Sequence, residues 1–308
     1  MATQLRGVPL IDLAGTEGDP VSEVAAACRD WGFFQVINHG VDAALIEGAL
    51  AMSEAFFDLD PPEKRRCSRS LENPWGYYDR ELTKNLRDRK EIFDIGQDDT
   101  VPWPARPAAF RATLAAFEAA CYQLALRVTA LAARGLGLDA SALRPFFAPA
   151  HSSFMRLNYY PQEHALLADD DMPAAGPLGI SPHTDAGGVT VLLQDSVSGL
   201  QVCHKDDWYD VEAVPGALTI NIGDMMQVWA NDQYYAALHR VLASRGRRRY
   251  SIAYFLNPGN DAVVSPLGKD APRYRDIPWQ EYRSLRAQGD YGDYGEEVQI
   301  KQYRSQAG

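Results

Sequence analysis

Two histidines and one aspartate have the residue types and the spacing of a metal site. His183 and Asp185 are separated by a single residue, so on an extended strand their side chains point to the same face. His239 follows 54 residues after Asp185, in a run that is also typical of a strand. Two imidazoles and one carboxylate on one face bind an octahedral Fe(II) ion and leave its other side open for a co-substrate and O2.

A second pair of residues points to that co-substrate. Arg249 and Ser251 follow ten residues after His239 and share a strand face. A guanidinium binds a carboxylate with two parallel hydrogen bonds, and the serine hydroxyl adds a donor. Alternatively, Arg249 belongs to the solvated basic turn that precedes it. Its place in an apolar strand favours a buried arginine, which needs a carboxylate partner.

A third pair lies earlier in the chain, in the run from Arg156 to Pro161. Asn158 and Tyr160 share a strand face and are expected to donate hydrogen bonds to the same co-substrate. Packing within a sheet is the alternative explanation for the tyrosine.

The elements that must position these residues change character near residue 150. Short apolar or alternating runs separated by turn residues predict a β-sandwich or barrel after that point. Strands are expected over 154–160, 189–194, 200–203, 208–211, 217–222, 238–243 and 250–256. Before residue 150, apolar residues at helical spacing predict helices over 20–27, 41–57 and 108–138. Pro61 and Pro62 are expected to end the second of these helices. Short strands are expected over 8–13 and 31–37. The sequence therefore predicts a helical N-terminal half packed around a C-terminal β core.

Composition excludes several classes of protein. The net charge of −11 over 308 residues argues against a nucleic-acid partner, because such proteins carry a basic surface. No run of about 18 uncharged apolar residues occurs, so we expect no membrane span. The four cysteines are scattered without a Cys-x-x-Cys pair, which is typical of reduced thiols in an intracellular protein. A cytoplasmic location is the expectation.

Taken together and in order, these motifs resemble the iron- and 2-oxoglutarate-dependent dioxygenases, specifically the isopenicillin N synthase-like family. The resemblance runs from about residue 7 to residue 258. The matching stretches are Val8-Pro-Leu-Ile-Asp-Leu13, Trp31-Gly-Phe-Phe-Gln-Val-Ile-Asn-His-Gly-Val41, Asn158-Tyr-Tyr-Pro161, Pro182-His-Thr-Asp185, Leu192-Leu-Gln-Asp195, Gly199-Leu-Gln-Val202, Asn221-Ile-Gly-Asp224, His239-Arg-Val241 and Arg249-Tyr-Ser251.

The resemblance implies an α+β fold with a mainly β core. This core is a double-stranded β-helix, or jelly roll, with a helical N-terminal region packed around it. It also implies four segments. Residues 1–105 form the N-terminal region of the family, 106–148 a long helical segment, 150–258 the Fe(II)/2-oxoglutarate core, and 259–308 a helical and aromatic tail that closes the pocket.

The resemblance further implies the roles of the site residues. The catalytic metal ligands would be His183, Asp185 and His239. Arg249 and Ser251 would hold the distal carboxylate of 2-oxoglutarate, helped by Tyr160 and Asn158. The enzyme would use Fe(II), 2-oxoglutarate and O2, with ascorbate as a candidate stimulant. It would hydroxylate, desaturate or demethylate a small molecule and release succinate and CO2.

Three alternatives remain open: an oxidase of the same fold that works without 2-oxoglutarate, of the isopenicillin N synthase-like or ethylene-forming type; a catalytically inactive ligand-binding homologue; and a protein hydroxylase. We expect a small, mostly apolar or aromatic substrate. Tyr78, Phe93, Phe255 and the aromatic tail are candidate pocket residues. We further expect a monomer or weak dimer with neither a nucleic-acid nor a membrane partner.

Overall fold

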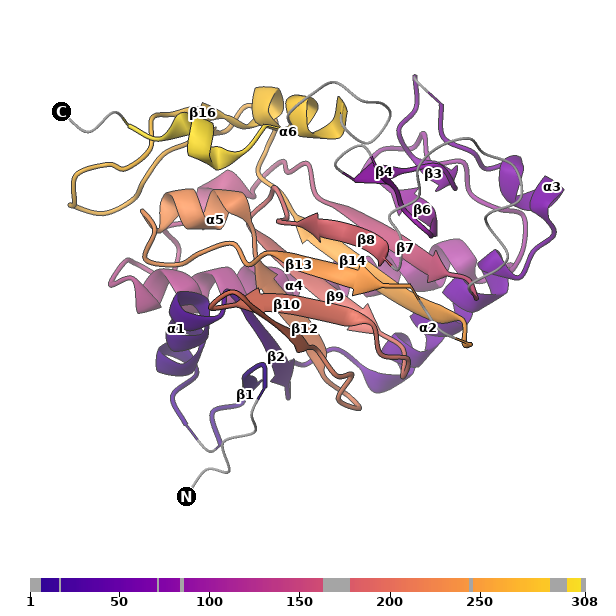
Figure 1. Cartoon of the computed structure of the whole chain (residues 1–308), viewed down its shortest axis with the longest axis horizontal. Helices are drawn as coiled ribbons and strands as arrows, with labels where there is room; N and C mark the ends of the chain where they lie inside the picture. The colour runs from indigo at the N-terminus through magenta and orange to yellow at the C-terminus, as the bar shows by residue number, and fades with distance from the viewer. Residues whose placement is uncertain are drawn as a thin grey trace.

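Two β-sheets form the centre of the molecule in the computed structural model, which describes residues 7–16, 18–70, 72–83, 86–162, 178–243, 246–288 and 298–305. The large sheet has eight strands, in the spatial order β1 (Leu10–Asp12), β2 (Phe33–Ile37), β12 (Leu218–Ile222), β9 (Val189–Gln194), β14 (Arg249–Leu256), β7 (Phe154–Tyr160), β6 (Glu91–Ile95) and β3 (Gly76–Tyr78). The small sheet has the order β11 (Asp207–Asp210), β10 (Leu200–His204), β13 (His239–Leu242) and β8 (Leu178–His183). Figure 1 shows the small sheet in front of the large one. Neighbouring strands are antiparallel except β1 and β2.

The two sheets pack face to face through their alternating apolar side chains. Phe33 of the large sheet lies in one buried cluster with Leu200, Val202 and Val241 of the small sheet. This arrangement confirms the expected jelly-roll core. Two short pairs, β4 (Leu82–Thr83) with β5 (Leu86–Arg87) and β15 (Val263–Val264) with β16 (Ile277–Pro278), lie outside it.

Three helices cover the other face of the large sheet: α1 (Pro20–Asp30), α2 (Ala43–Phe57) and α4 (Phe110–Gly135). Asp19 and Asp42 begin α1 and α2, because each carboxylate accepts hydrogen bonds from two free backbone N–H groups of the first turn. By length and composition α4 is apolar enough to cross a membrane. In this fold its apolar stripe packs against β9 and β14.

The N-terminal half contributes more β-structure than the sequence predicts. β1 and β2, which correspond to the short strands expected over 8–13 and 31–37, extend one edge of the large sheet, and β3 and β6, which were not expected, extend the other. The short strand β3 and the fully buried β6 show no alternation of apolar and polar residues that would reveal them. β6 pairs with β7, about 60 residues away in the chain, and β3 pairs in turn with β6.

The proline pair at residues 61 and 62 has a different role from the one expected. The helix α2 already ends at Phe57, and Pro61 begins a new short helix, α3 (Pro61–Arg65). Proline is tolerated there because the first residues of a helix need no N–H donor.

Two further helices lie at one end of the sheets, α5 (Asp224–Trp229) and α6 (Trp279–Gln288), drawn in orange and yellow in Figure 1. α6 is anchored by two buried hydrogen bonds. Trp279 Nε1 donates to Ser152 Oγ at 2.8 Å, and Tyr282 Oη donates to Asp224 Oδ2 at 2.7 Å. Short 3-10 turns occur at Arg144–Phe146 and Ile300–Tyr303.

Candidate active site

The two predicted histidines lie directly opposite each other in the small sheet. His183 ends β8 and is paired with His239 at the start of β13, with ring centres 4.3 Å apart. Asp185 follows in the loop after β8, and its Oδ1 lies 3.8 Å and 3.7 Å from Nε2 of His183 and His239. One ligand atom from each of the three residues lies within 4.8 Å of the others, which is a geometry that could hold a metal ion.

Each histidine is held by its other ring nitrogen. Nδ1 of His183 lies 2.8 Å from the carbonyl oxygen of Ser181, and Nδ1 of His239 lies 3.0 Å from that of Ala237. When Nδ1 donates its proton to these carbonyls, Nε2 keeps its lone pair for a metal.

The two oxygens of the Asp185 carboxylate also have different roles. Thr190 and Asn221 donate hydrogen bonds of 2.5 Å and 2.7 Å to Oδ2, so Oδ1 is left to face the histidines. Neither donor was predicted as a site residue. Asn221 could have been predicted from the sequence, because a polar residue in the apolar strand Leu218–Ile222 needs a buried hydrogen-bond partner.

Protonation also suits metal binding. Burial lowers the pKa of His183, and the neighbouring imidazole of His239 lowers it further. Burial alone raises the pKa of Asp185, but the two histidines and the hydrogen bonds from Asn221 and Thr190 outweigh it, so the net shift is downward. The neutral imidazole and the ionised carboxylate are the forms that ligate metals.

The four residues predicted to hold the co-substrate form two cross-strand pairs. In the register of β14 and β7, Arg249 lies opposite Tyr160 and Ser251 lies opposite Asn158. The guanidinium carbon of Arg249 is 4.8 Å from the centre of the Tyr160 ring. All four residues are buried and line one cavity of about 80 Å³ together with the metal-site residues.

Arg249 has an unused donor in this cavity. The residue is 1% exposed, its Nε donates to the carbonyl of Val197 at 3.2 Å, and its Nη2 donates to Gln194 Oε1 at 3.0 Å. Among the described residues, its Nη1 has no hydrogen-bond partner. A buried guanidinium without a carboxylate is costly, so this observation fits a bound anion at that position. It also argues against the alternative that Arg249 is part of a solvated basic turn.

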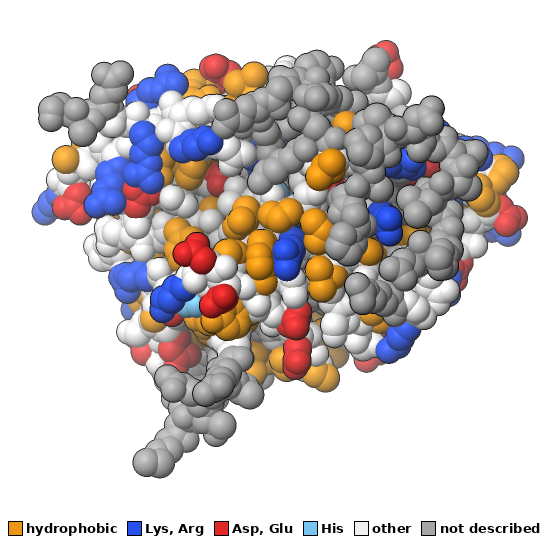
Figure 2. Space-filling model, viewed as in Figure 1, with side chains coloured by type: hydrophobic (Ala, Val, Ile, Leu, Met, Phe, Trp, Pro, Cys, Tyr) orange, Lys and Arg blue, Asp and Glu red, His pale blue; other side chains and the backbone are white. Residues whose placement is uncertain are grey.

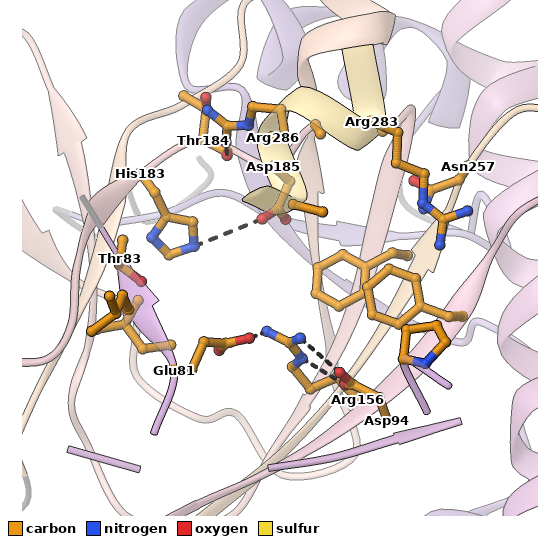
Figure 3. Close-up of a pocket in the computed structure, with 18 of the residues that line it drawn as sticks. Glu81, Thr83, Asp94, Arg156, His183, Thr184, Asp185, Asn257, Arg283 and Arg286 are labelled. Atoms are coloured by element: carbon orange, nitrogen blue, oxygen red, sulfur yellow. Dashed lines mark hydrogen bonds and ion pairs between the residues drawn. The ribbon is translucent and has the colours of Figure 1, made fainter. Parts of the chain in front are cut away.

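A second cavity of about 240 Å³ adjoins the first at the metal site. His183 and Asp185 belong to the walls of both. Figure 3 shows this outer cavity, with His183 and Asp185 on one side and Arg283 of α6 on another. The inner cavity therefore suits a co-substrate and the outer cavity suits the molecule to be oxidised.

The outer cavity is more charged than the aromatic pocket that the sequence led us to expect. Arg156 donates to both oxygens of Asp94 at 2.7 Å and 2.8 Å and to Glu81 at 2.9 Å. Lys90 lies 2.6 Å from Glu81 as well. Burial raises the pKa of Glu81, but Arg156, Lys90 and Arg69 outweigh it and the net shift is strongly downward.

The predicted aromatic pocket residues have different positions. Phe255 lines both cavities and stacks on Phe154 with ring centres 4.7 Å apart. Phe93 instead packs against Phe56 in the core, and Tyr78 lies under the guanidinium of Arg69. Neither of these two lines the cavities. From the aromatic tail, Trp279 lines the outer cavity, and residues 289–297 lie outside the described part of the chain.

Comparisons with known proteins agree with this geometry. A profile of the 2OG-Fe(II) oxygenase superfamily matches residues 151–258, and a profile described as non-haem dioxygenase in morphine synthesis N-terminal matches residues 8–112. Jasmonate-induced oxygenase 4 of Arabidopsis thaliana is 33% identical over 303 residues, covering 92% of this chain and 84% of that protein. Gibberellin 20 oxidase 2 of Oryza sativa subsp. japonica is 38% identical over 283 residues, covering 84% and 68%.

Solved structures are similar over nearly the whole chain. The crystal structure of JOX2 in complex with 2OG, Fe and JA superposes with a TM-score of 0.84 at 30% identity, covering 97% of this chain and 89% of that one. The dioxygenase for auxin oxidation (DAO) in rice gives a TM-score of 0.77 at 27% identity, with coverage of 97% and 100%. The chain belongs to the 2OG-Fe(II) oxygenase superfamily and is a 2-oxoglutarate-dependent, non-haem iron dioxygenase that oxidises a small molecule.

Proposed function

We propose that His183, Asp185 and His239 bind the catalytic Fe(II). The proposal is supported by the orientation of the three side chains. Each has one polar atom held by the protein and another aimed at the shared centre. Two imidazole nitrogens and one carboxylate oxygen form the donor set that suits Fe(II) and leaves coordination positions open.

We further propose that the inner cavity holds 2-oxoglutarate, with its distal carboxylate on Arg249 and Ser251. The observation that carries this assignment is the unpaired, buried Nη1 of Arg249, which lies in the cavity that also contains the metal ligands. Asn158 lies opposite Ser251 across the strand pair, and Tyr160 covers the guanidinium. These two residues position the co-substrate rather than take part in the chemistry.

Bound Fe(II), together with 2-oxoglutarate and O2, supplies the oxidation of a C–H bond with release of succinate and CO2. The protein residues bind and orient the reactants. Arg249 fixes one end of the co-substrate, and Asn221 and Thr190 keep the free oxygen of Asp185 directed at the metal. Phe154 and Phe255 form an apolar wall of the outer cavity that excludes water from the substrate.

The reaction outcome, hydroxylation, desaturation or demethylation, depends on which substrate C–H bond faces the metal. Among the relatives, flavonol synthase/flavanone 3-hydroxylase of Matthiola incana is 30% identical over 290 residues, and JOX2 carries JA in its crystal structure. We propose a small organic metabolite of secondary metabolism as substrate for this chain. We also propose that the protein is a cytoplasmic monomer or weak dimer and that it acts without a nucleic-acid or membrane partner. Its four cysteines are free thiols, which suits a reducing compartment.

The direct test is 2-oxoglutarate turnover. The purified protein, reconstituted anaerobically with Fe(II) and then given 2-oxoglutarate, O2 and ascorbate, is expected to form succinate. Arg249→Lys is expected to lose this activity at low co-substrate concentration. Oxidation of a substrate without any succinate would favour the 2-oxoglutarate-independent oxidase, and failure to retain iron would favour the inactive ligand-binding homologue.

A further inference from the structure

The outer cavity has an excess of positive charge, although the whole chain carries a net charge of −11. Five basic side chains line it, namely Arg69, Lys90, Arg156, Arg283 and Arg286. Apart from the proposed metal ligand Asp185, its acidic lining residues are Glu81 and Asp94. Figure 2 shows acidic and basic side chains mixed over the face that carries the small sheet, so the excess is a local feature of the cavity.

Three of the cations share these two carboxylates. Arg156 binds Asp94 through two hydrogen bonds and Glu81 through a third. Lys90 pairs with Glu81 at 2.6 Å, and Arg69 lies 3.5 Å from Asp94. The carboxylates of Glu81 and Asp94 are therefore already paired with these three cations.

The two arginines of α6 differ from each other. Nη2 of Arg286 donates to the carbonyl of Thr184 at 2.7 Å, which ties α6 to the loop of the metal site. Arg283 makes no hydrogen bond or ion pair within the described part of the chain, and its guanidinium lies 5.8 Å from the Phe154 ring centre. In Figure 3 this guanidinium extends into the cavity.

Burial opposes the charge of Arg283. It lowers the pKa of this guanidinium, and the negative charge of Asp94 counters that effect only in part. A half-buried cation without a partner costs free energy, and an anionic ligand would remove that cost.

The position of Arg283 is fixed by its helix. Trp279 and Tyr282 on one side of it and Arg286 on the other are all hydrogen-bonded to the protein body. A guanidinium held on a rigid element loses little conformational freedom when it binds a ligand.

The rest of the cavity wall has an apolar side. Phe154 and Phe255 stack beside Arg283, and Trp75, Leu82 and Ile180 also line the space. Within the described residues, the wall thus combines one cation that pairs with no carboxylate, Arg283, with an apolar surface, and the metal-site residues His183 and Asp185 form another side.

We propose that the prime substrate is a small carboxylic acid whose carboxylate pairs with Arg283 and whose apolar body lies against Phe154 and Phe255. The planar guanidinium matches a carboxylate with two parallel hydrogen bonds, and one uncommitted cation suits a single negative charge. This inference rests on the proposed function, because it assumes that 2-oxoglutarate occupies the inner cavity.

The test uses matched acids and amides. The anaerobic enzyme is loaded with Fe(II) and saturating 2-oxoglutarate, so that a second carboxylate cannot enter the inner cavity. The probes are 3-phenylpropanoate, cyclohexylacetate and octanoate, each compared with its own primary amide by isothermal titration calorimetry. We expect each acid that fits to bind on the order of 10- to 100-fold more tightly than its amide, the range for a hydrogen-bonded charged pair.

Three variants make the test specific. Arg283→Gln is expected to abolish the preference for acid over amide, and Arg283→Lys is expected to keep part of it. Arg111→Gln, which changes an exposed arginine of α4 that lines neither cavity, is the matched control and should keep all of it. Acids that bind no better than amides, or a preference that survives in Arg283→Gln, would overturn the proposal. Tighter binding of phenyl phosphate than of any acid would overturn the carboxylate assignment.

A second measurement separates this inference from the proposed function. The affinity of Arg283→Gln for 2-oxoglutarate is measured with Fe(II) alone and is expected to equal that of the unchanged protein. If 2-oxoglutarate affinity falls in Arg283→Gln but not in Arg249→Lys, the co-substrate lies in the outer cavity and the proposed function is wrong about the site. If it falls only in Arg249→Lys while acids and amides bind alike, the proposed function stands and the carboxylic acid proposal fails.

Discussion

Arg249 and Tyr160 face each other across the antiparallel pair of β14 and β7, with the guanidinium carbon 4.8 Å from the centre of the ring. The next pair on the same face, two residues along each strand, is Ser251 with Asn158. The sheet register therefore brings four polar residues together beside the metal ligands. Tyr160 and Arg249 are 89 positions apart in the sequence. A shift of one residue in either strand would turn its two residues away from the cavity and separate the two pairs.

Removing a metal ligand should abolish iron binding without unfolding the protein. His183→Ala, Asp185→Ala and His239→Ala are each expected to lose bound Fe(II) and all turnover, since the core consists of apolar clusters that do not depend on an ion. Metal content after anaerobic reconstitution and the thermal unfolding midpoint check this. His151→Ala serves as control, because His151 stacks on Tyr122 away from the site. Full activity in any ligand variant at limiting Fe(II) would refute the assignment.

Asn221 should act on the metal through Asp185. Asn221→Ala removes the 2.7 Å hydrogen bond to Oδ2 and leaves only the one from Thr190 to orient the carboxylate. Loss of such a partner typically weakens metal affinity by about 10- to 100-fold. We expect a loss in this range for Fe(II), measured by anaerobic competition with a chelator. Asn221→Asp is not equivalent, because it adds a buried charge. An unchanged Fe(II) affinity in Asn221→Ala would show that Thr190 alone orients the ligand.

Arg249→Lys tests the co-substrate site. Lysine keeps the positive charge but cannot form two parallel hydrogen bonds with a carboxylate. We expect the KM for 2-oxoglutarate to rise on the order of 100-fold, equivalent to about 3 kcal/mol for a desolvated charged pair. Steady-state succinate formation measures it. A normal KM for 2-oxoglutarate together with weaker substrate binding would mean that Arg249 holds the substrate instead.

The stability of the protein should fall as the pH rises because of Glu118 in α4. Burial raises the pKa of this carboxyl from its ordinary value of 4.5 to about 7, although the hydrogen bond from Gln97 opposes the shift. A carboxyl whose pKa is higher in the folded state stabilises the fold fully below pH 4.5, and this contribution is lost as the pH rises to about 7.

Glu118→Gln removes that dependence. We expect the variant to match the unchanged protein near pH 4.5 and to be more stable at pH 8, by on the order of 3 kcal/mol if the whole shift is recovered. Denaturant unfolding at both pH values provides the measurement. Equal stabilities at pH 8 would mean that Glu118 is ionised at no cost in the folded state.

The sequence predicted the parts of the site that follow a local rule. Arg249 with Ser251 and Asn158 with Tyr160 are each two residues apart on a strand, and strand geometry directs each pair to one face. His183 and Asp185 have the same spacing and do come together, but β8 ends at His183, so the loop after it positions Asp185 rather than the strand that the sequence predicts. The strand from Val189 to Gln194 was placed correctly for the same reason, because its apolar run is bounded by turn residues.

What the sequence could not predict depends on contacts between distant segments. Arg156 and Asp94 are 62 positions apart, and only the pairing of β6 with β7 brings them together. Arg283 lies on a polar helix whose sequence resembles a solvated surface helix. Its direction into the cavity follows from the anchoring of Trp279 and Tyr282, which no periodicity reveals.

The most direct test of the whole account is a crystal structure of the protein prepared anaerobically with Fe(II) and 2-oxoglutarate. The account predicts one metal ion bound by His183, Asp185 and His239. It places the distal carboxylate of 2-oxoglutarate within hydrogen-bond distance of Arg249 and Ser251 and leaves Arg283 without a co-substrate contact. A 2-oxoglutarate molecule bound to Arg283 in the outer cavity, with Nη1 of Arg249 still unpaired, would contradict it.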